Sequence, residues 1–296
     1  MKFTKMEGCG NDYIYVDGGA YPMDPAKKPD LVRRLSDRHY GIGGDGVIFI
    51  NPVPDGSADF EMEMWNADGT RSQMCGNGIR CVAKFVYDKG MTDKKSLRIV
   101  SAGSVKLLEL YTEKNHDGKE TVRTVRVDMG APILEAGRIP VDAAKTGAPS
   151  ETDETGRLVD APICVRGGTY RMTCVSMGNP HAVMFVEDTE KFPLELVGPA
   201  FEHHEAFPER VNAEFVHVRN RSEVDMRVWE RGTGETLACG TGACAVGVAC
   251  VLNGLTEETV TVHLRGGDLE IRYDRDADRV YMTGPAVTVF EGEVKV

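Results

Sequence analysis

Residues 60–90 read FEMEMWNADGTRSQMCGNGIRCVAKFVYDKG, and residues 224–254 read VDMRVWERGTGETLACGTGACAVGVACVLNG. The two stretches align without a gap at a constant offset of 164 residues. Before the tryptophan of each stretch, apolar residues alternate with polar ones, which is typical of a half-buried strand. A turn-rich segment, a cysteine and a helix that begins at Gly-x-Gly and ends at a glycine follow in both. The sequence therefore predicts an internal repeat of one strand–loop–cysteine–helix unit.

The repeat extends further, because GNDY at residues 10–13 returns as GNPH at residues 178–181. We therefore predict two duplicated α/β domains in an α+β arrangement, related by pseudo-symmetry. The helix at 79–89 is expected to be amphipathic. The helix at 243–252 is apolar all round, so we expect it to run through the middle of its domain with sheet wrapped about it.

Most of the remaining segments are short alternating patterns that predict strands, among them residues 105–111, 213–219, 259–264 and 280–284. A polar, turn-rich stretch near 113–126 predicts a linker, and another at 146–157 predicts a surface loop. The expected N-terminal domain comprises residues 1–124, with a C-terminal strand at 285–296 returning to it. The expected C-terminal domain comprises residues 125–284.

Composition excludes several classes of protein. The 296 residues are 41% hydrophobic and 27% charged, as in soluble globular proteins. There is no apolar run long enough to span a membrane, and the first residues, MKFTKMEGCGNDY, lack the apolar core of a secretory signal. The net charge of −11 is spread along the chain and argues against a nucleic-acid partner. We expect a cytoplasmic protein that binds neither nucleic acid nor membrane.

The eight cysteines include no C-x-x-C pair, which argues against a zinc site. Cys81, Cys244 and Cys250 fall within apolar helical patterns and are predicted to be inert core residues. Cys75 and Cys239 differ, because each stands at the start of a predicted helix.

A thiol at a helix start meets unpaired N–H groups and the positive end of the helix dipole, which lower its pKa. The same N–H groups bind a carboxylate and stabilise the charge that it gains when the neighbouring carbon loses a proton. Two such ends facing one cleft would let one thiolate remove a proton while the opposing thiol delivers one to the other face. We therefore predict that Cys75 and Cys239 invert a stereocentre, without a metal or a pyridoxal cofactor.

Six segments carry a family resemblance: KMEGCGNDYIYVD, RHYGIGGDG, WNADGTRSQMCGNGIRC, VSMGNPHAV, RVNAEFV and WERGTGETLACGTGACA. Together they closely resemble diaminopimelate epimerases, a pyridoxal-independent family of two-cysteine amino-acid epimerases. The resemblance runs in order from Lys5 to about residue 250. It implies two domains, each a β-barrel-like sheet around a central helix, with the active site in the cleft between them. It also implies a homodimer without cofactor that converts LL-2,6-diaminopimelate to the meso isomer for lysine and peptidoglycan precursor synthesis.

By this resemblance Cys75 and Cys239 are the acid/base pair, and His181 and Glu230 assist them. The substrate-binding positions that it implies are Asn11, Asn66, Gly76, Asn77, Asn179, Asn212, Glu230, Arg231, Gly240 and Thr241. A substrate with two amino-acid ends needs a distal set of partners, and an arginine with asparagines can hold a carboxylate and an ammonium group.

Structural roles also fit several of these residues. The three asparagines Asn11, Asn66 and Asn179 lie in turn sequences. The pair Glu230 and Arg231 would suit an exposed ion pair, which contributes little to stability.

The sequence also departs from the family pattern. Gly46 stands where some members carry a glutamine that touches substrate. Glu7 and Cys9 replace the usual histidine and leucine.

Two other functions compete with this one. The first is another racemase of the same superfamily that acts on proline, hydroxyproline or histidine. Proline-type members typically carry a histidine after the first Cys-Gly, whereas this chain has Asn77. A non-enzymatic thiol switch between Cys75 and Cys239 would explain the two cysteines but not the polar residues around them.

Overall fold

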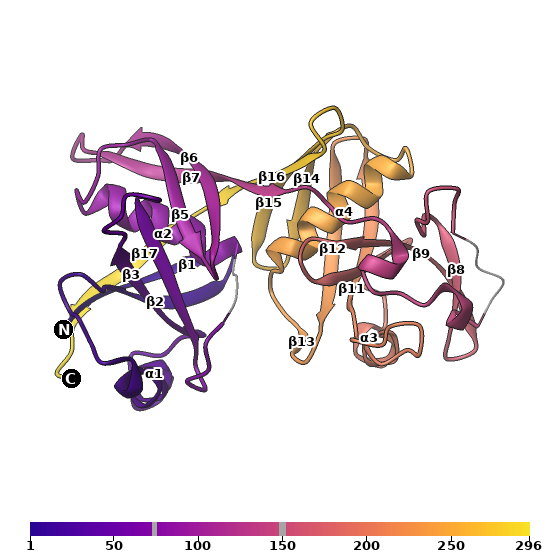
Figure 1. Cartoon of the computed structure of the whole chain (residues 1–296). Coiled ribbons are helices and arrows are strands. Elements are labelled where there is room, and N and C mark those ends of the chain that lie inside the picture. Colours follow the sequence, from indigo (N-terminus) through magenta and orange to yellow (C-terminus); the bar gives the residue numbers. More distant parts are fainter. Residues whose placement is uncertain (73–75, 148–151) are drawn as a thin grey trace. The chain divides into compact units, whose positions relative to one another are not determined.

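The computed structural model describes residues 1–72, 76–147 and 152–296. The chain forms two compact units (Figure 1). Unit 1 comprises Met1–Asp128 with Thr283–Val296, and unit 2 comprises Met129–Met282. Cys75 and part of the surface loop expected at 146–157 lie outside the described residues.

Unit 1 is a series of hydrogen-bonded strands with two α-helices. Strand β1 pairs antiparallel with β17 and β2, and the series continues through β2–β3 parallel, β3–β4 antiparallel, β4–β5 parallel, β5–β6 antiparallel and β6–β7 antiparallel. The elements are β1 (Lys2–Gly8), β2 (Asn11–Asp17), η1 (Pro25–Lys27), α1 (Lys28–Ser36), β3 (Gly46–Pro52), β4 (Phe60–Asn66), α2 (Gly76–Asp88), β5 (Ser96–Ser101), β6 (Ser104–Lys114), β7 (Glu120–Gly130) and β17 (Val287–Glu293).

Unit 2 repeats much of this plan. Its pairs are β8–β9 and β9–β10 antiparallel, β10–β11 parallel, β11–β12 antiparallel, β12–β14 parallel and β14–β15 antiparallel, and β13 pairs with β12. The elements are η2 (Ala136–Arg138), η3 (Ala143–Lys145), β8 (Ala161–Val165), β9 (Gly168–Ser176), β10 (Pro180–Phe185), α3 (Leu194–Glu202), β11 (Asn212–Asn220), β12 (Glu223–Glu230), β13 (Gly234–Glu235), α4 (Gly240–Leu252), β14 (Thr259–Leu264) and β15 (Gly267–Asp274). Strand β16 (Arg279–Pro285) begins in unit 2 and its last residues belong to unit 1.

The internal repeat is therefore visible in the topology. The series from β1 to β6 and the series from β9 to β15 follow the same order of antiparallel, parallel, antiparallel, parallel and antiparallel pairs. Helices α2 and α4 follow the equivalent strands β4 and β12. The predicted α+β fold with a repeated strand–loop–helix unit is confirmed.

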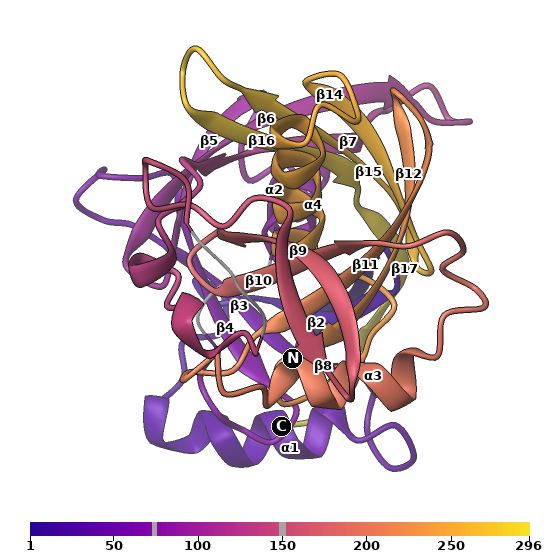
Figure 2. The same ribbon diagram turned by 90° about the vertical axis from the view of Figure 1, so that its right-hand side faces the viewer.

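Each unit has a central helix. In unit 2, α4 packs against β9, β10, β11, β14 and β15, and Figure 2 shows it among these strands. In unit 1, α2 packs against β1, β2, β5 and β6. Cys81, Cys244 and Cys250 are fully buried, as predicted for core residues. Helix α2 is amphipathic, as predicted, but Arg80 and Lys84 on its polar side are buried as well.

The linker expected near 113–126 is a β-hairpin. Strands β6 and β7 pair there with Lys114 opposite Glu120, and residues 113–120 are all exposed. A ribbon that meets water on both faces carries polar residues at every position, so its sequence shows no alternation and resembles a linker.

Candidate active site

The start of α4 places Cys239 beside a set of helix amides. Cys239 is the N-cap residue, and its carbonyl accepts the Ala243 N–H at 2.9 Å. The first N–H groups of a helix have no acceptor within it, so they are available to an anion. Gly242 allows β11 to approach this turn, since a Cβ there would lie 2.7 Å from Glu214 Oε1.

The Cys239 side chain is buried, with 6% of the residue exposed. Burial raises the pKa of the Cys239 thiol well above its usual range, and the carboxylates of Glu230 and Glu214 raise it further. The hydroxyl of Thr241, 3.6 Å from Sγ, and the Gly242 N–H lower the pKa. The expectation that the helix start gives Cys239 a lowered pKa is therefore wrong, because desolvation outweighs these two donors.

A chain of polar side chains leads from Cys239 into the core of unit 2. Thr241 Oγ1 accepts a hydrogen bond from Asn179 Nδ2 at 3.3 Å, and Asn179 Oδ1 lies 2.9 Å from His181 Nε2. His181 Nδ1 in turn lies 2.7 Å from Glu214 Oε1. His181 thus reaches the thiol through Asn179 and Thr241.

Glu230 and Arg231 end β12 and begin the turn toward Cys239. The Thr236 hydroxyl donates to Glu230 Oε1 across that turn. The Arg231 N–H donates to Asn212 Oδ1 at 3.0 Å, and Arg231 Nη1 donates to the Glu209 carbonyl at 2.9 Å. The two neighbouring side chains therefore have separate partners and do not form the ion pair that a structural role would suggest.

Asn212 is buried, and both ends of its side-chain amide contact backbone. Its Nδ2 donates to the Pro180 carbonyl at 2.9 Å, and its Oδ1 accepts the Arg231 N–H. It therefore ties the starts of β10 and β11 to the turn after β12. In this way unit 2 brings together Asn179, His181, Asn212, Glu230, Arg231, Cys239, Gly240 and Thr241.

In unit 1, Asn11 and Asn66 lie at strand ends, and both of these strand ends contact Asp45, the residue before β3. Asn11 begins β2 and donates to Asp45 Oδ2 at 2.7 Å. Asn66 ends β4 and donates to Thr70 Oγ1 at 3.1 Å, and the next N–H, of Ala67, donates to the Asp45 carbonyl at 2.9 Å. Asn66 therefore also closes the turn after β4, where its carbonyl accepts the Gly69 N–H at 2.9 Å, whereas the Asn11 side chain contacts a residue far away in sequence.

Gly76 and Asn77 are the first residues of α2. The Asn77 side chain is buried, and its Oδ1 has no hydrogen-bond partner among the described residues. The Asn77 Cβ lies 3.3 Å from the Cβ position of Gly8, at the end of β1. Cys75, which precedes Gly76 in the chain, lies outside the described residues.

Two buried charged residues were not identified from the sequence. Glu214 is fully buried in the middle of β11. Arg80 is fully buried in α2, and it donates to the carbonyls of Gly76 at 3.2 Å and Pro285 at 3.1 Å, and to Cys9 Sγ at 3.7 Å. An ionisable residue within an otherwise apolar strand or helix pattern was the available signal for both.

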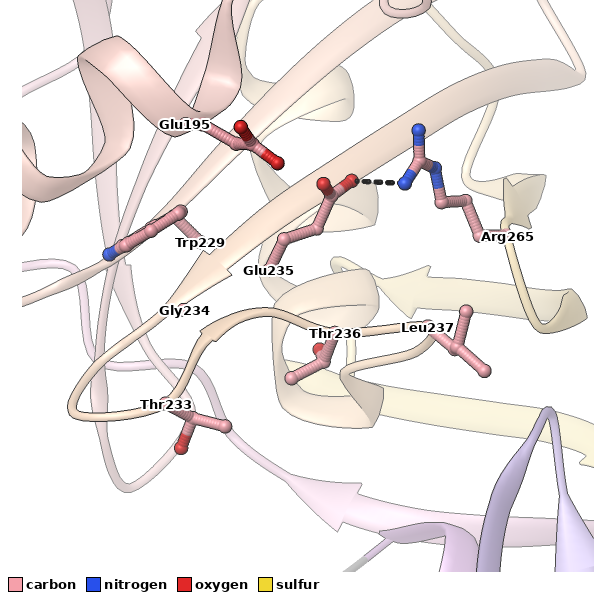
Figure 3. Close-up of a pocket in the computed structure, with 8 residues that line it drawn as sticks. All are labelled: Glu195, Trp229, Thr233, Gly234, Glu235, Thr236, Leu237 and Arg265. Atoms are coloured by element: carbon pink, nitrogen blue, oxygen red, sulfur yellow. Dashed lines mark ion pairs between the residues drawn. The ribbon is translucent and has the colours of Figure 1, made fainter.

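Beside this cluster lies an open cavity of about 640 Å³ (Figure 3). Its lining residues are Glu195, Trp229, Thr233, Gly234, Glu235, Thr236, Leu237 and Arg265. Glu235 forms ion pairs with Arg227 at 2.8 Å and with Arg265 at 3.0 Å, so its charge is already balanced. No predicted site residue lines this cavity, which lies against the turn between Glu230 and Cys239.

Two further searches covered the described part of the chain. It contains no group of three His, Cys, Asp or Glu side chains that could hold a metal ion. Within the same residues, no helix is both long enough and apolar enough to cross a membrane.

Two solved structures share the fold over the whole chain. A phenazine biosynthesis protein from Bacillus anthracis gives a TM-score of 0.68 at 14% identity, covering 100% of this chain and 99% of that one. A probable proline racemase from Agrobacterium radiobacter gives a TM-score of 0.66 at 14% identity, covering 100% of this chain and 93% of that one. The chain therefore has the same class of fold as these two proteins over its whole length.

The sequence comparisons define the family within that class. A family model for diaminopimelate epimerase matches residues 3–135 and 173–289. A diaminopimelate epimerase from Agathobacter rectalis is 52% identical over 296 residues, covering 100% of both chains. The chain belongs to the diaminopimelate epimerase family, which is a family of isomerases, and the resemblance given by its motifs is confirmed.

Proposed function

We propose that this chain converts LL-2,6-diaminopimelate to the meso isomer in lysine biosynthesis, and so also supplies peptidoglycan precursor synthesis. The observation that carries the proposal is the arrangement around Cys239. The Cys239 thiol at the start of a central helix lies beside the linked side chains of Thr241, Asn179 and His181 and near Glu230, which supports a role for these residues in the reaction.

The reaction is an exchange of protons at one carbon by two cysteines, without pyridoxal. The Cys75 thiolate takes the α-proton, and the electron pair left on the carbon delocalises into the substrate carboxylate. The Cys239 thiol gives its own proton to the opposite face and becomes the thiolate. Cys239 suits the donor role in this direction, because burial raises its pKa and keeps the thiol protonated. The reverse reaction exchanges the two roles.

Helix amides stabilise the charge that develops. The N–H groups of Gly76 and Asn77 at the start of α2, and of Gly240 and Thr241 at the start of α4, hold the carboxylate at the reacting centre. Glu230, Asn11 and Asn179 hold the α-ammonium and carboxylate of that centre.

The distal end of the substrate is assigned to Arg231 with Asn66 and Asn212. The guanidinium is at the surface, where it can form the bidentate pair that a carboxylate favours. The two hydrogen bonds of the buried Asn212 amide support a contribution through the placement of Arg231.

A cytoplasmic homodimer completes the proposal. Strand β17 exposes Val287, Val289 and Phe290, with 42%, 54% and 47% of each residue accessible. Three exposed apolar residues on one short strand are a feature of protein interfaces. A second copy of the chain is the partner that we propose for this strand.

The substrate is tested by incubating the protein with LL-diaminopimelate in D₂O. Loss of the α-proton NMR signal and appearance of the meso isomer are expected, with no exchange in parallel tubes containing proline, glutamate or histidine. Exchange with proline alone would replace the substrate assignment by that of a proline-type racemase.

The two-base mechanism is tested with Cys75→Ala and Cys239→Ala. Each variant is expected to lose epimerisation by several orders of magnitude while its circular dichroism and melting temperature stay close to those of the parent. Near-normal turnover by either folded variant would contradict the two-base mechanism, because the replaced cysteine would then not be needed for epimerisation.

A further inference from the structure

Glu214 is a buried carboxyl group that the mechanism above does not use. It lies on β11, in unit 2, and neither its side chain nor that of His181 is exposed. Its Oε1 lies 2.7 Å from His181 Nδ1, and its Oε2 has no hydrogen-bond partner within the described residues. Burying such a group costs free energy unless it is neutral or paired, so its position calls for a physical reason.

The hydrogen bonds that lead away from Glu214 have a defined direction. Asn179 Nδ2 donates to Thr241, so Asn179 Oδ1 is the acceptor that faces the imidazole. His181 Nε2 must then carry a proton. Thr241 Oγ1 accepts from Asn179, and its own hydrogen can donate to Cys239 Sγ, 3.6 Å away, when that sulfur is a thiolate and has no hydrogen to donate. The chain then ends in an O–H donor at the sulfur atom.

The direction of these hydrogen bonds depends on which group contacts His181 Nδ1. If Nε2 carries the proton of the neutral ring, Nδ1 is an acceptor and needs a donor. Only the Glu214 carboxyl contacts Nδ1 among the described residues, so the two groups share one proton. The other ionisable groups that face Glu214 are Glu230 on β12, Cys239 at the start of α4 and Cys174 on β9. None of these is a cation, and burial raises the pKa of Glu214, so a proton is retained at the pair.

We propose that Glu214 is a positioning residue of the epimerase site, which holds His181 with its proton on Nε2 and thereby keeps the Thr241 hydroxyl directed at Cys239. This rests on the proposed function. When Cys239 has given up its proton, the Thr241 O–H stabilises the thiolate. A Glu214 carboxyl that shares a proton adds less negative charge beside that thiolate than a free carboxylate would. Gly242 makes the approach possible, because any Cβ there would displace Glu214 from the helix start.

The first test is made on the unaltered protein labelled with ¹⁵N in its histidines. Two-bond ¹H–¹⁵N correlation spectra report which ring nitrogen carries a proton. For His181 we expect a protonated Nε2 and an Nδ1 that is either an acceptor or shares its proton with Glu214. A neutral ring with an unprotonated Nε2 would overturn the proposal, whatever the variants do.

The second test compares Glu214→Gln with Glu214→Leu. The glutamine amide can donate to Nδ1, so Glu214→Gln should keep the His181 spectrum and retain kcat within a few fold. Leucine has no donor, so in Glu214→Leu the proton should distribute between both ring nitrogens. The pH dependence of Cys239 alkylation, followed by peptide mass mapping, should also shift to higher pH. We expect kcat to fall by ten- to a hundredfold in this variant, with a smaller change in KM.

Glu202→Gln is the matched control. Glu202 is also a buried glutamate of unit 2, but it accepts from Trp229 Nε1 and the Gly232 N–H, so the His181 spectrum should not change. A folded Glu214→Leu variant with the parent's His181 spectrum and alkylation curve would overturn the proposal. If this variant does not fold, Glu214→Gln decides: a His181 proton moved from Nε2 to Nδ1 overturns the proposal, and an unchanged spectrum supports it. Neither readout needs substrate, so failure of the parent to epimerise diaminopimelate would count against the proposed function alone.

Discussion

Gly46 shows how the local backbone accounts for a departure from the family motif. It lies opposite Asn66 in the β3–β4 pair. A Cβ there would lie 1.9 Å from the Trp65 carbonyl oxygen and 2.8 Å from the Tyr13 ring. The glutamine that some family members carry at this position cannot be placed on this backbone unless β4 moves. The substrate contact of that glutamine is therefore absent from the site proposed here.

The same clash predicts the effect of Gly46→Ala. Backbone must shift to accept the methyl group, so we expect the free energy of unfolding to fall by about 1–3 kcal/mol or more. Urea denaturation measures it. Gly137→Ala is the control, because no atom lies within 4 Å of the Cβ position at Gly137. Equal stability of Gly46→Ala and the parent would mean that β3 and β4 pair differently here.

Arg231 carries the assignment of the distal carboxylate. Lysine keeps the charge but loses the planar fork, so Arg231→Lys should weaken binding of both diaminopimelate isomers by roughly 1.5–3 kcal/mol. This corresponds to a rise in KM of about ten- to a hundredfold. Arg221→Lys, in an exposed pair with Glu257, should leave KM unchanged. An unchanged KM for Arg231→Lys would place the distal end of the substrate elsewhere.

At the scale of elements, the β1–β2 hairpin is held to the loop after α1 by charged side chains. Lys5 of β1 and Arg38 of the loop both pair with Asp12 of β2, and Arg38 also contacts Asp45 at 2.9 Å. Burial alone would raise the pKa of Asp12, but Arg38 and Lys5 outweigh it and hold that pKa below its usual range. The network supports Asn11, which shares Asp45 with Arg38.

The lowered pKa of Asp12 predicts that the free energy of unfolding depends on pH. Asp12 stabilises the fold above the pKa of the unfolded chain, about 3.9, and this contribution is lost as pH falls through the lower folded pKa. Asp12→Asn should therefore cost about 1–3 kcal/mol of unfolding free energy at pH 7, and the gap to the parent should narrow below about pH 4. Asp276→Asn, in an exposed turn, should have the same free energy of unfolding as the parent. A gap that is constant with pH would mean that Asp12 acts through packing and not through its charge.

Patterns within single elements were predictable from the sequence. The repeat predicted α2 and α4 and the strands before them, because the periodic apolar face of a helix or strand is visible within a short run of consecutive residues. Part of the β6–β7 hairpin was mistaken for a linker because its exposed tip, residues 113–120, has no such face, although β7 alternates beyond the tip. The contacts of Glu214 and Arg80 depend on which strands surround a helix, and this follows from pairings between residues far apart in sequence. The side chains around Cys239 could be assigned only through the family motifs, and their roles stay a proposal.

At the scale of the whole molecule, the exposed apolar residues of β17 predict self-association. Val289→Lys places a charge where 54% of the valine is exposed. We expect the parent to sediment as a dimer at micromolar concentration and Val289→Lys to sediment as a monomer. Leu196→Lys, on α3 of unit 2 and 55% exposed, should remain dimeric. A monomeric parent, or a Val289→Lys variant that stays dimeric, would remove β17 from the interface.

Unit 2 is one continuous stretch of chain, whereas unit 1 is interrupted by it and is completed by β17, which pairs with β1. During synthesis on the ribosome, every residue of unit 2 is therefore made before the last strand of unit 1 exists. Until β17 arrives, the edge of β1 that will receive it offers unpaired N–H and C=O groups to any other strand. The first unit to be started is thus the last that can be finished, and until then its open edge is a place where a nascent chain can pair with the wrong strand.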